Sequence, residues 1–468
     1  MRVIIVGGGK LGYKLAESLS QQENDVVVMD IDDHTLEKVD ENLDVLSIKS
    51  NGVRIETLKQ LQIEHSDLTI AVTGSDETNI LVASMAKKMG CRKVIARVRN
   101  PEYADQVDFI KASMKLDHIV NPELATAKEI VKYLLKSQAL YMEDFIKNKV
   151  GMVDFRVQDL KGLAGKKIKN LGLDEPILVV AISRNGEIII PHGETDILAK
   201  DTIYLMGEKE SINAFSKKYM GPREVRATRK VLLIGGGRIT YYLANKLIEN
   251  GVDVKIIEQD KERCEYLAEN IKGGLIIYGD GTDVDLLNAE NMGDMDALVS
   301  LTGLDEENLL IALLAKQCGV NKTIAKVSRT NYIPIIEQLG IDIAINSILI
   351  TAGEILRFVR GGRVVSLSLL LGGQAEVLEI IAQEKSKIVG TRLADLGLPK
   401  GIIIAAVLHE NKIVIPKGNS VIHPGDRVVV FCLQAEVVNL KKYFYTAKGG
   451  FINELWGGYK SSGKSSPF

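Results

Sequence analysis

Three glycines near the start of the chain have the spacing of a loop that binds phosphate groups. Gly7, Gly9 and Gly12 form the pattern G-x-G-x-x-G directly after the apolar run RVIIV. In such a loop the first glycine permits a tight turn, the second lets backbone N–H groups approach a pyrophosphate, and the third allows a helix to pack closely on a strand. The phosphates would lie at a helix N-terminus, where free N–H groups and the helix dipole attract anions. The pattern therefore predicts a dinucleotide-binding loop, and the alternative is the same fold with an empty pocket.

Asp30 ends the next apolar run, DVVVMD, where such loops place an acidic residue. We expect its carboxylate to accept hydrogen bonds from ribose hydroxyls, and its charge disfavours a ligand with a 2′-phosphate.

A second loop of this kind begins at Gly235, 228 residues after the first. Gly235 and Gly237 keep the first two glycines, but Thr240 replaces the third. A β-branched side chain then enters the contact between helix and strand, and we expect it to displace the helix slightly. Glu258 keeps the acidic ribose contact.

The two copies differ in their basic residues. The first copy has Arg97 and Arg99 in the run IARVRN, where the second copy has Lys326 and Ser328. Arginine offers a planar fork that matches phosphate oxygens, whereas lysine offers a point charge. We therefore expect the first pocket to prefer a more phosphorylated or more tightly held nucleotide. The alternative for Arg97 is a solvated residue at the end of a strand.

Further polar residues follow predicted strands at the same end. Thr73–Gly74 and Thr302–Gly303 come after the fourth strand of each copy, and Asp280 adds a carboxylate where the first copy has Asn51. The carboxyl ends of strands line the ligand crevice of such folds, so these residues are candidates for ligand contacts.

Short apolar runs alternate with helical patterns in the segments that must position these residues. Strands are expected at 2–6, 25–30, 44–50, 68–74 and 93–98, and again at 230–235, 253–258, 275–280, 297–303 and 323–327. Helical patterns such as 33–42 and 77–90 lie between them. Strands that alternate with helices predict an α/β fold with a doubly wound, Rossmann-like parallel sheet.

The chain is an internal duplication of a larger and a smaller domain. TGSDETNIL from Thr73 matches TGLDEENLL from Thr302, and GKKIKNLGL from Gly165 matches GTRLADLGL from Gly390. The polar stretch from Gly221 to Lys230 is expected to be a linker. The expected domains are Rossmann domain 1 at 1–149, small α+β domain 1 at 150–220, Rossmann domain 2 at 228–362, small domain 2 at 363–445, and a disordered tail at 446–468.

Composition excludes several classes of protein. The net charge of −2 gives no global field that favours nucleic acid or anionic lipid. The four cysteines are scattered and form no C-x-x-C pair, which is typical of a reducing compartment. We expect neither a signal peptide nor a membrane-spanning helix, so any work at a membrane would go through a partner.

Taken together, these motifs resemble the tandem RCK proteins, the regulators of potassium conductance. The resemblance rests on G-x-G-x-x-G, T-G-x-D-E-x-N, I-A-[RK]-V and a trailing module with I-P-x-G, and it covers roughly residues 1–445. It implies a cytosolic regulatory subunit that assembles as a homo-oligomer, a tetrameric ring, beneath a potassium-translocating membrane subunit similar to TrkH or TrkG. It also implies NAD(H) or ATP/ADP in the Rossmann domains, and small domains whose relatives bind effectors such as cyclic dinucleotides.

The resemblance also implies the ligand contacts. In the first copy they are Gly7, Gly8, Gly9, Lys10, Leu11, Asp30, Thr73, Gly74 and Arg97, and in the second Gly235, Gly236, Gly237, Arg238, Ile239, Glu258, Thr302 and Gly303. The residue pattern itself adds Gly12, Asn51 and Asp280. No catalytic residue and no metal ligand is predicted.

The main alternative is an NAD-dependent oxidoreductase, which would need an acid or base beside the nicotinamide. The histidines form no constellation shared by the two copies.

G-x-x-x-x-G-K-S at Gly458–Ser465 matches a P-loop, but three residues remain after it, too few for the required helix. A transcription factor would need a basic recognition helix, which is not evident. The acidic run Asp305–Glu307 is consistent with a cation site or with a solvated helix start.

Overall fold

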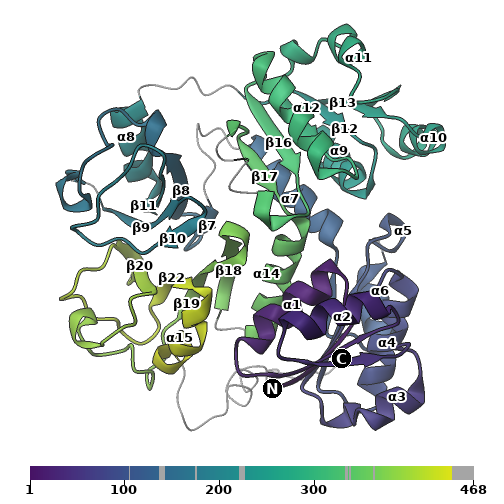
Figure 1. Ribbon diagram of the computed structural model, residues 1–468, viewed down its shortest axis with the longest axis horizontal. Helices are drawn as coiled ribbons and strands as arrows, with labels where there is room; N and C mark the ends of the chain where they lie inside the picture. The colour runs from purple at the N-terminus through teal and green to yellow at the C-terminus, as the bar shows by residue number, and fades with distance from the viewer. Residues whose placement is uncertain are drawn as a thin grey trace, which may run out of the picture.

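The computed structural model describes residues 1–104, 106–135, 143–173, 176–220, 227–332, 336, 339–361 and 364–444 (Figure 1). The predicted tail at 446–468 and most of the predicted linker, residues 221–226, lie outside these ranges. Among the helices within them, none is both long enough and apolar enough to cross a bilayer.

The first sheet is parallel throughout and has the strand order β3-β2-β1-β4-β5-β6. Its strands are β1 (Arg2–Val6), β2 (Asp25–Asp30), β3 (Leu46–Lys49), β4 (Leu68–Ala71), β5 (Lys93–Arg97) and β6 (His118–Val120). The strand order reverses beside β1, between β2 and β4, and ligands of such sheets bind outside the carboxyl ends of the strands at this point.

Six helices accompany this sheet. They are α1 (Lys10–Ser20), α2 (Asp33–Asn42), α3 (Ile55–Gln60), α4 (Asp76–Lys88), α5 (Pro101–Ala104) and α6 (Val107–Ser113). The side chain of Asp32 accepts a hydrogen bond from the Thr35 N–H and so caps α2, and Ser75 caps α4 through the Thr78 N–H. These caps satisfy backbone donors that a helix start leaves free.

The second sheet repeats the first in order and direction, β14-β13-β12-β15-β16-β17. Its strands are β12 (Lys230–Ile234), β13 (Asp253–Glu258), β14 (Leu275–Tyr278), β15 (Ala297–Ser300), β16 (Lys322–Lys326) and β17 (Ile343–Ile345). Its helices include α9 (Arg238–Glu249), α10 (Lys261–Asn270), α11 (Val284–Ala289) and α12 (Asp305–Gln317). The predicted doubly wound fold is confirmed in both copies.

Each small domain is a five-stranded antiparallel sheet closed by one helix. The first has the order β10-β9-β11-β8-β7, from β7 (Glu143–Phe145), β8 (Val150–Arg156), β9 (Ile177–Arg184), β10 (Glu187–Ile189) and β11 (Thr202–Glu208), followed by α8 (Lys209–Met220). The second has the order β18-β19-β22-β20-β21, from β18 (Val364–Leu370), β19 (Ala375–Ile381), β20 (Ile402–His409), β21 (Lys412–Val414) and β22 (Arg427–Leu433), followed by α15 (Val437–Phe444). The α+β prediction for these domains is confirmed.

The two small sheets pack on each other. One core cluster joins Val180 and Met206 of the first sheet to Val377 and Val429 of the second, and all four side chains are fully buried. In Figure 1 the two domains accordingly lie next to each other, one in blue and one in yellow-green.

The helices that leave the Rossmann sheets are exchanged between the copies. Helix α7 (Pro122–Leu135) follows the first sheet but packs on the second, where Ile130 and Leu134 share a core with Leu243. Helix α14 (Ser347–Arg360) follows the second sheet but packs on the first, beside α1 (Figure 1). Each sheet therefore completes its core with a helix from the other half of the chain.

Polar contacts fix this exchange. The carbonyl of Leu134 accepts hydrogen bonds from Thr228 Oγ1 at 2.7 Å and from Lys322 Nζ at 2.9 Å. On the other side, the ring of His118 stacks on Phe358 of α14 at 4.6 Å between centroids. Each exchanged helix thus makes defined contacts with the other half of the chain. Separation of the two halves would expose the cores of both Rossmann domains.

Candidate functional site

The first glycine-rich loop has the backbone that an anion site needs. Gly7 has a φ of +106°, and a Cβ on it would lie 2.8 Å from the backbone N of Thr73. A Cβ on Gly12 would lie 1.8 Å from the carbonyl oxygen of Gly7. Helix α1 then begins at Lys10, and no side chain caps its N-terminus at Gly9. The first N–H groups of the helix are thus left for a ligand.

Asp30 lies directly beside this loop. Its Oδ2 accepts the N–H of Gly8 at 2.6 Å, and its Oδ1 accepts the N–H groups of Ile31 and Asp32 at 2.7 and 3.0 Å. A carboxylate has about four acceptor positions, so one is left for a ribose hydroxyl. The backbone therefore holds the predicted ribose acceptor in place at the carboxyl end of β2.

A buried asparagine fixes the Thr73–Gly74 turn. Asn79 Oδ1 accepts the Thr73 N–H at 2.7 Å, and its Nδ2 donates to the carbonyls of Thr73 and Arg97 at 3.2 and 2.9 Å. Asp76 Oδ2 accepts the N–H groups of Arg99 and Asn100, both at 2.8 Å. The ends of β4 and β5 are thereby held together at the crevice.

Two arginines surround the same turn. The guanidinium of Arg97 donates to the Thr73 carbonyl, and that of Arg99 donates to the Gly74 carbonyl. Burial, followed by the charge of Arg99, lowers the pKa of Arg97 to about 10, so it remains cationic at neutral pH. Its Nε is buried without a hydrogen-bond partner. Arg97 is therefore not the solvated strand-end residue of the alternative interpretation.

The second loop repeats this geometry with a modified third position. Gly236 N–H donates to Glu258 Oε2 at 2.5 Å, as Gly8 does to Asp30. Thr240 is accommodated because its hydroxyl donates to the Gly235 carbonyl. A Cβ on Gly235 would lie 3.2 Å from the nearest backbone, against 2.8 Å at the equivalent position of the first loop, so the second turn is slightly looser.

Arg263 is a basic residue of the second site that sequence reasoning missed. It extends from α10, its Nε donates to the Gly236 carbonyl at 2.5 Å, and its guanidinium lies 4.5 Å from the ring centre of Tyr266. The position corresponds to Thr35 in the first copy, which carries no charge. The second loop thus has a guanidinium beside it from α10, the helix that follows β13. Lys326 ends β16, which lies on the other side of β12 in the sheet.

Charged residues of the two loops influence each other across the boundary between the Rossmann domains. Besides burial, the pKa of Arg97 responds to Arg238 of the second loop, and the pKa of Lys326 responds to Lys10 of the first loop. Glu123, at the start of α7, lies within the electrostatic reach of Arg99, Arg97 and Arg238, and burial raises the pKa of its carboxyl. Its Oε2 is buried without a hydrogen-bond partner.

Other predicted site residues make turns. Asn51 Oδ1 accepts the Val53 N–H at 3.2 Å, and Asp280 Oδ1 accepts the N–H and hydroxyl of Thr282, both at 2.8 Å. These hydrogen bonds lower the pKa of the Asp280 carboxyl. Both residues lie at the carboxyl ends of third strands, so they remain at the rim of the predicted pockets.

The acidic run at the start of α12 is neither solvated throughout nor a free cation site. Asp305 is buried and accepts the N–H groups of Ser328 and Arg329 at 2.9 Å, while Glu306 accepts a hydrogen bond from the Arg329 guanidinium at 2.6 Å. Asp305 corresponds to Asp76, and the buried Asn308 corresponds to Asn79. The repeated T-G-x-D-E-x-N motif was the signal that could have identified these positioning residues.

A separate cavity of about 690 Å³ lies between the exchanged helices α7 and α14. Lys128 and Tyr133 of α7 and Glu354 and Arg357 of α14 contribute to its walls. The glycine-rich loops do not line it, so it is distinct from the nucleotide pockets predicted from the sequence.

Family models match both copies of both domains. The TrkA-N domain matches residues 3–122 and 231–347, and the TrkA-C domain matches residues 152–219 and 377–445. These matches cover nearly all of the Rossmann sheets and most of the antiparallel sheets, leaving out β7 and β18.

Relatives of known name match over nearly the full length. The chain is 40% identical over 453 residues to the Trk system potassium uptake protein TrkA homolog 1 of Methanosarcina mazei, covering 95% of this chain and 100% of that protein. It is 32% identical over 440 residues to the Trk system potassium uptake protein TrkA of Haemophilus influenzae, covering 92% of this chain and 95% of that protein.

Solved structures share the fold. The crystal structure of the GsuK RCK domain has a TM-score of 0.55 at 17% identity and covers 94% of each chain. The GsuK channel bound to NAD has a TM-score of 0.56 at 16% identity and covers 94% of this chain and 78% of that one. With tandem TrkA-N and TrkA-C domains and relatives of this similarity, the chain belongs to the TrkA family of Trk system potassium uptake proteins.

Proposed function

We propose that this protein is the cytosolic nucleotide-binding subunit that gates a Trk-type potassium uptake system. NAD(H) or ATP/ADP binds at the two glycine-rich loops, and binding changes potassium transport through a membrane subunit similar to TrkH or TrkG. The relatives named above are potassium uptake proteins, and solved neighbours of the same fold are described as bound to NAD and to ADP. Protein and ligand would then lie on the cytoplasmic face of the membrane, held there by the partner.

The observation that carries this proposal is the pair of uncapped helix starts beside fixed carboxylates. Neither Gly9 nor Gly237 provides a side-chain cap, so both helices present free N–H groups to an anion. Asp30 and Glu258 each accept the N–H of the second loop glycine and stay beside the loop for a ribose. Phosphate and ribose are thus recognised by the same two features in both copies.

The electrostatic influence between the two pockets supports a gating role. After burial and Arg99, Glu123 of α7 and Arg238 of the second loop are among the charges that affect the pKa of Arg97 in the first pocket. A γ-phosphate in the first pocket would add negative charge to this boundary, which a dinucleotide without that group would not do. Ligands that interact differently with two arrangements of the domains shift the balance between those arrangements. Helix α7, which has Glu123 in its first turn and packs on the other domain, would transmit the change.

The experiment is a calorimetric titration of the full chain with NAD, NADH, ADP and ATP, repeated with Asp30→Ala and Glu258→Ala. We expect each variant to lose binding at one pocket only. Asp25→Ala is the matched control, because Asp25 lies at the opposite end of β2 and is exposed. Absence of nucleotide binding by the unaltered chain, or equal binding by all variants, would contradict the proposal.

A further inference from the structure

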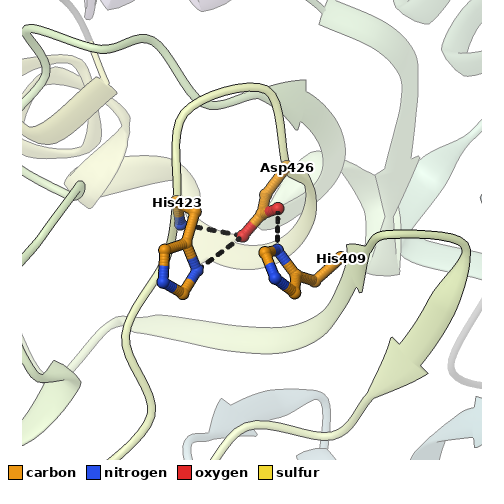
Figure 2. A group of neighbouring side chains, drawn as sticks. All are labelled: His409, His423 and Asp426. Atoms are coloured by element: carbon orange, nitrogen blue, oxygen red, sulfur yellow. Dashed lines mark hydrogen bonds and ion pairs between the residues drawn. The ribbon is translucent and has the colours of Figure 1, made fainter.

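Two histidines and a buried aspartate come together at one end of the second antiparallel sheet (Figure 2). His409 is the last residue of β20, His423 lies in the loop before β22, and Asp426 directly precedes β22. One potential ligand atom from each residue lies within 4.8 Å of the other two. Sequence analysis missed the group because His409 is 17 residues from Asp426 and meets it only through the pairing of β20 with β22.

The protein backbone holds Asp426 in position. Its Oδ2 accepts the His423 N–H at 2.8 Å, and its Oδ1 lies 2.7 Å from His409 Nδ1. Its side chain is 5% exposed, whereas those of His409 and His423 are 38% and 53% exposed. The carboxylate is thus fixed and buried, while both imidazoles border solvent and leave a path by which an ion can enter.

The first small domain contains a different set of side chains at the equivalent positions. Asp201 corresponds to Asp426, and its carboxylate accepts two hydrogen bonds from the guanidinium of Arg184, at 2.9 and 2.8 Å. Its Oδ2 also accepts the Leu198 N–H at 2.8 Å, which matches the His423 N–H contact. Arg184 corresponds to His409 and Leu198 to His423. The second domain therefore replaces one permanent cation and one apolar residue by two imidazoles.

This replacement removes a permanent charge from beside a buried carboxylate. A buried carboxylate is costly unless a positive charge or a metal ion accompanies it. An imidazole provides a positive charge only when it is protonated, but as a neutral group it is the commonest metal ligand in proteins. Glu410, next to His409, is a further negative charge that favours a cation at this place.

We propose that His409, His423 and Asp426 form a binding site for a divalent transition-metal ion, and that Zn²⁺ is the ion the site takes. Imidazole nitrogen and carboxylate oxygen bind Zn²⁺ at about 2.0–2.2 Å. Tetrahedral coordination at that length brings neighbouring ligand atoms to about 3.3 Å, which small rotations of the two exposed imidazoles achieve from the observed separation. Three protein ligands leave the fourth position open to water or to a further ligand.

The structural consequence is a link across the end of the sheet. β20 and β22 are hydrogen-bonded neighbours, and the ion would join the end of one to the start of the other. In the first domain the ion pair of Arg184 and Asp201 makes this link permanently. In the second domain the link between β20 and β22 would form only while the metal ion is bound. The site is separate from the nucleotide pockets.

The test is a calorimetric titration of the chelator-treated full chain with Zn²⁺ alone, without nucleotide. We expect one tightly bound equivalent at this site and a higher unfolding temperature with the ion. His423→Ala removes an exposed ligand whose side chain contributes little to the fold, and it should weaken binding by at least about tenfold. His192→Ala, which removes an exposed histidine of the first small domain, should leave binding unchanged.

His409→Arg is the second variant, because it recreates the arrangement of Arg184 and Asp201. It should keep the unfolding temperature of the metal-free protein and abolish zinc binding at this site. Failure of the full chain to bind Zn²⁺, or equal affinity in His423→Ala, His409→Arg and the unaltered chain, would overturn the proposal. Neither result would bear on nucleotide binding, which is measured separately.

Discussion

The guanidinium of Arg97 distinguishes the first pocket from the second at the scale of single residues. It is half-buried, it remains charged, and Lys326 replaces it in the other copy. Its guanidinium donates a hydrogen bond to the Thr73 carbonyl, and the like charge of Arg99 lies nearby. A phosphate that reached this guanidinium would gain a charge-assisted hydrogen bond.

We therefore predict that Arg97→Ala weakens ATP binding at the first pocket more than NADH binding. Hydrogen bonds to charged groups contribute about 1.5–3 kcal/mol, so ATP affinity should fall about tenfold to a hundredfold. The measurement is calorimetry with both ligands. Arg92→Ala is the matched control, since Arg92 lies at the other end of β5 and pairs with Asp67. An equal loss for ATP and NADH would show that Arg97 does not distinguish the γ-phosphate.

The third loop position provides a reciprocal prediction. Gly12→Thr should destabilise the first domain by about 1–3 kcal/mol, because its Cβ would meet the Gly7 carbonyl. Thr240→Ser should cost less, because serine keeps the hydroxyl that donates to the Gly235 carbonyl and needs no more space than the native side chain. Thermal unfolding and nucleotide titration measure both effects. Comparable destabilisation by the two substitutions would contradict the structural difference between the turns.

Sequence analysis at this scale identified the glycine-rich loops and the acidic residues, but not the residues that hold them in position. Gly7 and Asp30 follow a motif whose spacing is local, so their neighbourhood could be predicted. Asn79 stands in the repeated T-G-x-D-E-x-N motif, but Glu123 acts with charged residues as far along the chain as Arg238. Such contacts depend on tertiary packing, and a pattern read along one chain does not determine them.

At the scale of elements, the exchange of α7 and α14 links the two halves of the chain. The strand and helix series was predictable because buried parallel strands give continuous apolar runs. β6 and β17 were not predicted, because three-residue strands are too short to show a pattern. The exchange itself was not predicted either, since an apolar helix face does not specify which of two similar sheets it covers.

We predict that truncating a buried side chain of either exchanged helix destabilises the domain on which that helix packs. The domain that precedes the helix in sequence should be unaffected. Leu134→Ala should speed hydrogen exchange in β12 and β13, and Leu356→Ala should do so in β1 and β2. Each side chain is fully buried, so each loss should be about 2–5 kcal/mol. Faster exchange confined to the sheet that precedes the helix in sequence would contradict the exchange.

At the scale of the whole molecule, equivalent apolar residues are exposed on both Rossmann domains. Leu81 of α4 is 49% exposed and Leu310 of α12 is 67% exposed, and the two positions correspond in the repeat. Ile55 and Val284 form a second exposed pair of the same kind. We infer that these repeated positions contribute to an assembly interface. This is consistent with the homo-oligomer that the family resemblance implies.

We predict that Leu81→Asp combined with Leu310→Asp lowers the molar mass in solution while leaving thermal unfolding of the chain nearly unchanged. Light scattering after gel filtration measures the mass. Lys59→Asp is a control that adds charge at another exposed helix position of the first domain. An unaltered mass in the double variant would place the interface elsewhere.

We propose that nucleotide bound at these pockets controls potassium transport. The most direct measurement is potassium flux in vesicles that contain a TrkH-like subunit and this protein, with ATP, ADP, NAD or NADH added in turn. We expect flux to depend on which nucleotide is present, and we expect the dependence to be lost when Asp30→Ala and Glu258→Ala are combined. Flux that is the same with every nucleotide, or a nucleotide response that survives in the double variant, would contradict it.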